Sequence, residues 1–190
     1  MATEPHLRNP GSEHVRRAWD TIGDNDLRIR PEAAERIVEG LNEVLSGLYI
    51  LFNQVRKHYW LVEGAESNDV RSFLTDAADR LTDMTDEFSI RVHALGGVPV
   101  CGPMGVRQHA PIYIEAPHHY DIRSSLERDL DGYATLAARM RDHVELAERL
   151  GDEGTGELLF EHLETIEADA HALARYLDDD TLLRARTTES

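Results

Sequence analysis

The chain has 190 residues, of which 41% are hydrophobic, and its formal net charge is −16. That length fits a single domain of ordinary size, and no apolar run reaches the roughly 18 residues that a membrane span needs. A surface this acidic repels nucleic acid and attracts cations. The single cysteine, Cys101, cannot form an internal disulfide, and the first residues lack a secretion signal. We therefore expect a cytoplasmic protein without membrane association.

The basic residues are almost all arginine, because only Lys57 among the 20 Lys and Arg is a lysine. A GC-rich genome explains the scarcity of lysine but not the excess of carboxylates. Dense surface carboxylates keep a protein hydrated at high salt. We therefore interpret the composition as halophilic, an adaptation to a salt-rich cytoplasm.

Residues 1–30 carry five arginines and five acidic residues and show little apolar periodicity. They predict an extended N-terminal arm, with Val15, Trp19 and Ile22 available to dock on a neighbouring subunit. The arm has no net charge with which to bind phosphate, so we expect no DNA binding through it. Residues 31–182 are expected to form the folded domain and residues 183–190 a C-terminal tail.

Two amphipathic helices are expected first in the domain. One begins at Pro31, a favourable first-turn residue, and its apolar residues recur every three or four positions up to Val62. The other spans about 67–95, with Ser67 or Asn68 as its N-cap and the glycines at 96–97 as its stop. The turn at 63–66 is so short that the second helix must return antiparallel to the first.

The second half of the domain repeats this pattern after a long connection. Residues 96–120 contain four prolines, which forbid a continuous helix. A third helix begins at Asp121, a plausible N-cap, and a fourth runs from about Thr155 to Leu177. Two hairpins joined by one long crossover predict an all-α, ferritin-like four-helix bundle, with the crossover between helices two and three.

Several short segments carry a family resemblance. They are WLVEG at 60–64, VHALGGVP at 92–99 and the stretches 121–126, 146–151 and 177–182. In these segments the chain resembles the Dps family of mini-ferritins, and most of all its acidic archaeal members. The resemblance implies a closed homododecamer of tetrahedral symmetry that takes up iron, oxidises Fe(II) and limits oxidative stress.

The family's ferroxidase centre is shared between two subunits. Its pattern has a His directly before the Trp, a second His eleven residues after it, and then an Asp and a Glu one helical turn apart. In this chain those positions hold, in order, Tyr59, Arg71, Asp86 and Ile90. Only Asp86 is kept as a ligand, so we expect a degenerate centre in which Arg71 pairs with Asp86 or another acid across the subunit interface.

Two neighbouring residues leave an alternative open. His58 stands one position before the expected histidine and reaches the interface if the helix rotates slightly, while Tyr59 can bind Fe(III) as a phenolate. The opposing interpretation makes His58 a surface imidazole and Tyr59 an interface aromatic residue. Ferroxidase activity therefore remains undecided from the sequence.

Two groups of carboxylates are further candidates for iron handling. Asp152, Glu153 and Glu157 lie at the turn that in Dps relatives lines a threefold pore for cations. Asp76, Asp79 and Asp83 recur along the second helix and can nucleate ferric mineral. An ordinary solvated surface explains both groups equally well. The crossover residues His109, His118 and His119 match no zinc pattern and are interpreted as loop histidines.

Three functions follow from these observations. The first is a Dps-like cage that sequesters iron with a degenerate inter-subunit ferroxidase site. The second is a non-catalytic structural paralogue that forms a cage or co-assembles with an active one. The third is a nucleoid-associated DNA-protection protein, which the acidic charge makes the weakest of the three.

Overall fold

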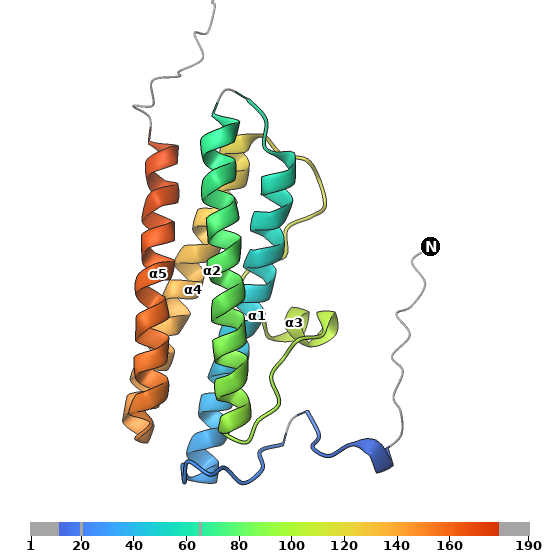
Figure 1. Ribbon diagram of the computed structural model, residues 1–190, viewed down its shortest axis with the longest axis vertical. Coiled ribbons are helices and arrows are strands. Elements are labelled where there is room, and N and C mark those ends of the chain that lie inside the picture. Colours follow the sequence, from blue (N-terminus) through green and yellow to red (C-terminus); the bar gives the residue numbers. More distant parts are fainter. Residues whose placement is uncertain (1–11, 20, 65, 179–190) are drawn as a thin grey trace, which may run out of the picture.

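The computed structural model describes residues 12–19, 21–64 and 66–178, and within these ranges it contains helices and loops but no strand. Four long helices, α1 (Pro31–Leu61), α2 (Ser67–Ala94), α4 (Ile122–Leu150) and α5 (Glu153–Leu177), form the bundle in Figure 1. α1 pairs with α2 and α4 with α5, and the two hairpins meet through α1 and α4. The predicted four-helix bundle with one long crossover is confirmed. None of the described helices is long and apolar enough to cross a membrane.

The helix ends follow from local chemistry at most of the predicted positions. α1 begins at Pro31 as expected, and α4 is capped by Asp121, whose carboxylate accepts a hydrogen bond of 2.9 Å from the Ser124 amide. α2 stops just before Gly96, which adopts a left-handed φ of +88°. The predicted side-chain cap of α2 is wrong, because Glu66 occupies the N-cap position and makes no capping bond.

The core is built from the apolar stripes of all four long helices. Its largest fully buried side chains include Leu41, Leu45, Phe88, Tyr133 and Met140. One charged pair adds to the packing: Arg80 on α2 donates from Nη2 to the Asp169 carboxylate on α5, at 2.6 Å. This ion pair joins the two helices on the side of the bundle opposite the α1–α4 contact.

The crossover between α2 and α4 passes alongside α1, as Figure 1 shows. It contains a short helix, α3 (Pro103–His109), which the sequence did not predict and which starts where Pro103 fixes the backbone for a first turn. Asn42 of α1 fastens the crossover, since its amide donates to Val98 O at 3.2 Å and accepts from the Val100 amide at 2.9 Å.

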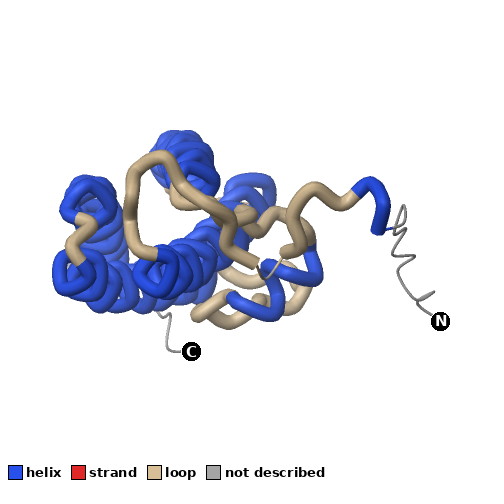
Figure 2. Tube along the Cα trace, turned by 90° about the horizontal axis from the view of Figure 1, so that it is seen from below, coloured by secondary structure: helices blue, strands red, loops and turns tan. Residues whose placement is uncertain are grey.

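The described part of the N-terminal arm includes the short 3₁₀ turn η1 (Ser12–His14) and lies on the same side of the molecule as the crossover (Figure 2). Trp19 packs against His109 of α3 with ring centroids 5.5 Å apart, and Ile22 packs on the core. Trp19 nevertheless keeps 41% of its surface exposed, and the docking of Val15, Trp19 and Ile22 on a neighbouring subunit stays a prediction. The predicted tail at 183–190 lies outside the described residues.

Candidate functional site

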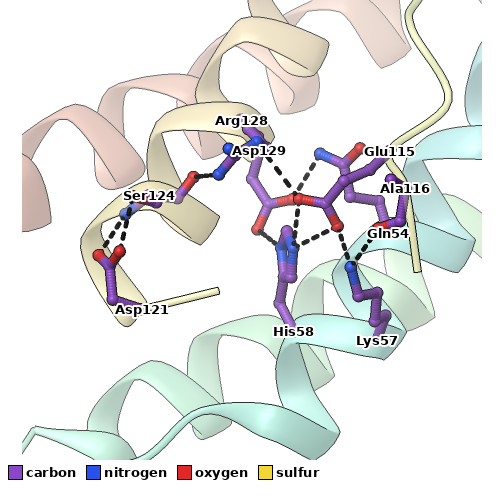
Figure 3. Close-up of polar contacts among 9 residues, drawn as sticks. All are labelled: Gln54, Lys57, His58, Glu115, Ala116, Asp121, Ser124, Arg128 and Asp129. Atoms are coloured by element: carbon purple, nitrogen blue, oxygen red, sulfur yellow. Dashed lines mark hydrogen bonds and ion pairs between the residues drawn. The ribbon is translucent and has the colours of Figure 1, made fainter. Parts of the chain in front are cut away.

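A charged cluster lies inside the bundle beneath the crossover (Figure 3). His58 of α1 stands at its centre, with Nδ1 2.8 Å from Asp129 Oδ2 of α4 and Nε2 3.0 Å from Glu115 Oε2 of the crossover. The three side chains are 2%, 0% and 6% exposed, in that order. Both ring nitrogens face acceptor oxygens, and a hydrogen bond at each nitrogen requires a proton in each contact. A neutral imidazole between two ionised carboxylates has a proton for only one of them, so the cluster needs one additional proton.

Further polar groups complete the cluster. Lys57 Nζ donates to Glu115 Oε2 and, at 3.0 Å, to the carbonyl of Ala116. Arg128 Nε lies 3.5 Å from Glu115 Oε1. On the other side, Gln54 Nε2 donates to Asp129 Oδ1 at 2.9 Å. These contacts join α1, the crossover and α4 through groups that are nearly all partnered.

The surroundings shift the protonation equilibria in one direction. Burial by itself lowers the pKa of His58, but the hydrogen bond and charge of Asp129, helped by Glu115, outweigh burial and raise that pKa above its ordinary value. Burial raises the pKa of Asp129, against the opposing effect of His58. Both shifts favour the state in which the cluster keeps its additional proton.

This cluster does not make a metal centre. The two carboxylates lie at opposite nitrogens of one imidazole ring, so a single ion cannot touch all three side chains. Correspondingly, no three His, Cys, Asp or Glu side chains converge on a metal position anywhere in the described ranges. His58 is also neither a surface imidazole nor free to rotate to an interface, so both sequence-based interpretations of it are corrected.

Of the four positions of the expected inter-subunit centre, three are exposed and one, Tyr59, is half-buried. Trp60 and Ile90 are 63% and 70% exposed, and Asp86 and Arg71 are exposed as well. Arg56 lies over the ring of Tyr59, 5.1 Å from its centroid. The exposure of Ile90 agrees with its expected place away from the core.

Arg71 is engaged within its own chain. Its Nη2 donates to Val62 O at 3.1 Å, beyond the end of α1, and no described residue forms an ion pair with Asp86. The expected pairing of Arg71 with an acid across an interface stays a prediction. Among the four expected ligand positions, Asp86 is thus the one carboxylate, and it has no ion-pair partner within the described residues.

The acids at the α4–α5 turn differ sharply from one another. Asp152 is 3% exposed; its carboxylate caps α5 by accepting from the Thr155 amide at 3.1 Å and forms an ion pair with Arg91 of α2. It therefore cannot serve as a free carboxylate in a pore, and this expectation is corrected. Glu153 and Glu157 are exposed.

The three acids of α2 do not differ in exposure. Asp76, Asp79 and Asp83 are all exposed along α2. Their expected role in ferric mineral nucleation stays a prediction, because an ordinary polar stripe has the same exposure.

Sequence reasoning missed five members of the interior cluster: Gln54, Lys57, Glu115, Arg128 and Asp129. A signal was present for Asp129, which stands three residues after Leu126 and four before Tyr133, within the apolar stripe of its helix. A carboxylate at a core position requires a buried partner. For Glu115 the sequence offers no such signal, because the residue belongs to an irregular segment.

Two antiparallel helix hairpins, one long crossover and polar side chains within the bundle define the ferritin-like class of protein. Residues 38–183 match the family model described as the ferritin-like domain. The chain is 42% identical over 166 residues to the "DNA protection during starvation protein" of Halobacterium salinarum, covering 87% of this chain and 91% of that protein.

Solved structures of Dps proteins have the same fold as this chain. The crystal structure of an archaeal Dps homologue from Halobacterium salinarum superposes with a TM-score of 0.87 at 40% identity, covering 91% of this chain and 97% of that one. The Dps protein of Vibrio cholerae, described as a member of a superfamily of ferritin-like diiron-carboxylate proteins, superposes with a TM-score of 0.77 at 25% identity, covering 85% and 99%. The chain belongs to the ferritin-like family and, within it, to the Dps proteins.

Proposed function

We propose that this protein is the subunit of a Dps-type cage that sequesters iron and limits oxidative damage, and that its inter-subunit oxidation centre is degenerate. Membership of the ferritin-like family supports iron as the substrate. The diiron-carboxylate description of the Vibrio cholerae relative supports the same substrate. The net charge of −16 supports attraction of cations over binding of nucleic acid.

The proposal of a degenerate centre rests on the side chains at the four expected ligand positions around Asp86. Of the four ligand positions implied by the family resemblance, Asp86 alone offers a metal-binding oxygen of the expected type. Ile90 has no lone pair, and the guanidinium of Arg71 is a fixed positive charge. A cation beside a bound Fe(II) is repelled, more strongly in a partly dry interface than in water.

Assembly is the second part of the proposal. Trp60 and Ile90 expose large apolar surface on one subunit, and exposed apolar patches commonly mark protein–protein contacts. We assign this surface to a twofold contact in a closed homododecamer. Repulsion between subunits of charge −16 weakens such a cage at low salt and is screened at high salt.

In this proposal, exposed acidic residues guide iron into the cage and nucleate its storage there. Glu153 and Glu157 at the α4–α5 turn are the pore candidates that keep free carboxylates, and several copies around an axis would concentrate Fe(II). Asp76, Asp79 and Asp83 of α2 are the nucleation candidates. Neither assignment requires the oxidation centre to be active.

The test restores the three missing ligands together, as Tyr59→His, Arg71→His and Ile90→Glu. Loss of the residues that only support metal ligands lowers metal affinity or activity ~10–100-fold. Loss of the ligands themselves should lower activity at least as much. We therefore expect the restored variant to oxidise Fe(II) with peroxide on the order of 100-fold faster than the natural chain. The measurement follows the ferric absorbance after mixing anaerobic Fe(II)-loaded protein with peroxide.

A matched control changes the same positions without adding ligands, as Tyr59→Phe, Arg71→Leu and Ile90→Leu. It is expected to oxidise Fe(II) as slowly as the natural chain. If the natural chain already matches the restored variant, the degenerate-centre proposal is wrong. If neither takes up iron although both assemble, the protein is the non-catalytic cage paralogue.

A nucleoid function is favoured by the names of relatives: "DNA protection" in that of the Halobacterium salinarum relative, and "DNA-binding protein" in those of relatives from Synechococcus and Nostoc. The excess of acidic residues in this chain opposes it, because phosphate binding depends on Lys and Arg. We therefore predict no DNA binding.

A further inference from the structure

A separate cavity of about 270 Å³ lies where the N-terminal arm crosses α1 and α3. Its walls are formed by Trp19, Ile22, Glu35, Val38, Glu39, Asn42 and His109. The volume is slightly below the ~300–1,000 Å³ of drug-sized ligand pockets, so it suits a molecule with one ring or a short branched chain. None of these residues takes part in the interior cluster or the expected inter-subunit centre.

The arm that forms one wall is anchored to the bundle. Arg17 Nη1 donates to the carbonyl of Gly96 at 2.6 Å, and the amide of Gly23 donates to the same carbonyl at 2.9 Å. A side chain at Gly96 would bring a Cβ within 2.3 Å of Gly23 O, so this close approach requires glycine there. The cavity is thus bounded by a fixed segment.

One part of the lining is aromatic and apolar. The indole of Trp19 is tilted against the imidazole of His109, with centroids 5.5 Å apart. Val38 and Ile22 supply aliphatic surface. Asn42 shapes the wall without offering free hydrogen-bonding groups, because both ends of its amide are bonded to the crossover backbone.

The other part is negatively charged. Glu35 and Glu39 are one helical turn apart on α1, a spacing at which like charges repel. Neither forms an ion pair with any residue of the described ranges, whereas nearby Glu43 is paired with both His143 and Arg139. Two free carboxylates beside an indole face are the elements that recognise an organic ammonium ion, through charge and cation–π attraction.

The imidazole of His109 lines the cavity with its ring. Its Nε2 is buried and has no hydrogen-bond partner among the residues the structure describes. Because this atom has almost no accessible surface, a molecule in the cavity does not reach it, and His109 contributes ring surface to the wall.

We infer that this cavity binds a small organic ammonium ion, whose apolar body packs against Trp19, Ile22 and Val38 and whose charged nitrogen lies between Glu35 and Glu39. An inorganic anion is disfavoured by the two carboxylates. A metal ion is disfavoured because no three metal-binding side chains converge within the described residues. A neutral apolar molecule would leave Glu35 and Glu39 without a cation. A neutral probe of the same shape therefore distinguishes binding of a cation from binding of an apolar molecule.

The test uses the full-length assembled protein and isothermal titration calorimetry with two probes of the same shape, benzylammonium and benzyl alcohol. Because the charge contributes to binding at a partly exposed aromatic site, benzylammonium should bind at least ~10-fold more tightly than benzyl alcohol. Substituting Glu35→Gln and Glu39→Gln together should make the two affinities equal.

The control carries the same change of charge on another pair of exposed acids one turn apart, Asp79→Asn with Asp83→Asn on α2. It should bind benzylammonium as the natural chain does. Equal weakening by this control would show general attraction to an acidic protein and overturn the proposal. Equal binding of the two probes, or no saturable heat with either, would overturn it as well.

Discussion

His58 and Tyr59 are neighbours on α1, yet they lead into two regions with opposite character. His58 is 2% exposed and held between two buried carboxylates. Tyr59 lies toward the outer face, where Trp60 and Ile90 are exposed and Asp86 has no ion-pair partner among the described residues. A histidine and two carboxylates of the kind that could serve iron chemistry thus hold helices together in the interior, whereas the face expected to perform that chemistry offers one carboxylate, Asp86, at its four expected ligand positions.

The largest expected contrast in stability comes from removing one carboxylate in each region. Asp129→Ala removes the buried acceptor of both His58 Nδ1 and the Gln54 amide and should lower the free energy of unfolding by about 3–5 kcal/mol. Asp86→Ala changes an exposed side chain and should stay within about 0.5 kcal/mol of the natural chain. Urea unfolding at fixed high salt measures both, and a loss at Asp129 no larger than that at Asp86 would contradict the comparison.

The pH dependence of stability sharpens the contrast. Because its partners raise the pKa of His58, the cluster stabilises the fold fully below the pKa of an unfolded histidine and loses that stabilisation as pH rises through the folded pKa. The raised pKa of Asp129 acts in the same direction, since the folded state binds the proton more tightly.

Unfolding midpoints measured from pH 6 to pH 9 should therefore fall toward alkaline pH. His58→Gln should flatten this dependence. His162→Gln, which removes the partly exposed pair with Glu87, is the matched control and should leave the slope nearly unchanged. A slope that survives in His58→Gln would place the titrating group elsewhere.

The acids of the α4–α5 turn provide a smaller effect and separate structure from iron access. Asp152→Ala removes both the N-cap of α5 and the ion-pair partner of Arg91, and should lower the free energy of unfolding by about 1–3 kcal/mol. It should leave the rate of Fe(II) uptake unchanged. Glu153→Gln with Glu157→Gln should show the reverse, slower uptake at nearly unchanged stability. Slowed uptake in Asp152→Ala at a temperature where it is fully folded would return Asp152 to the pore.

The smallest expected signal concerns DNA. We expect no shift of a DNA duplex by sub-micromolar protein in moderate salt, because the first thirty residues have no net positive charge and the remainder is acidic. A variant with arginines replacing Glu13, Asp24 and Asp26 of the arm is the positive control. Tight binding by the natural chain under these conditions would favour the nucleoid function.

The sequence predicted the bundle because each long helix carries its own apolar stripe, and the alternation of short and long connections fixes the topology. The expectation for His58 is wrong because nearness to Trp60 along the chain does not set the direction of its side chain, which is 2% exposed. Successive helix residues point about 100° apart, and His58 lies four residues after Gln54 and four before Val62, in the core register. A strict reading of the period would have placed it inside.

Other features of the site depend on contacts that no local pattern contains. Asp152 looks like an exposed turn residue, but Arg91 reaches it from 61 positions away in the chain. Glu115 lies in an irregular, proline-containing segment and becomes buried only because Lys57 and His58 of α1 bind it. Such partnerships arise when distant segments pack and are visible only in three dimensions.

The central claim is that the outer face around Asp86 no longer binds iron, and it is tested most directly by crystallography. Crystals of the assembled protein are soaked in Fe(II) under anaerobic conditions, and anomalous scattering is recorded on both sides of the iron absorption edge. We predict no anomalous peak between Asp86 and Trp60 of facing subunits, while the variant with Tyr59→His, Arg71→His and Ile90→Glu shows one there under the same soak. An iron peak at that position in the natural protein would contradict the account.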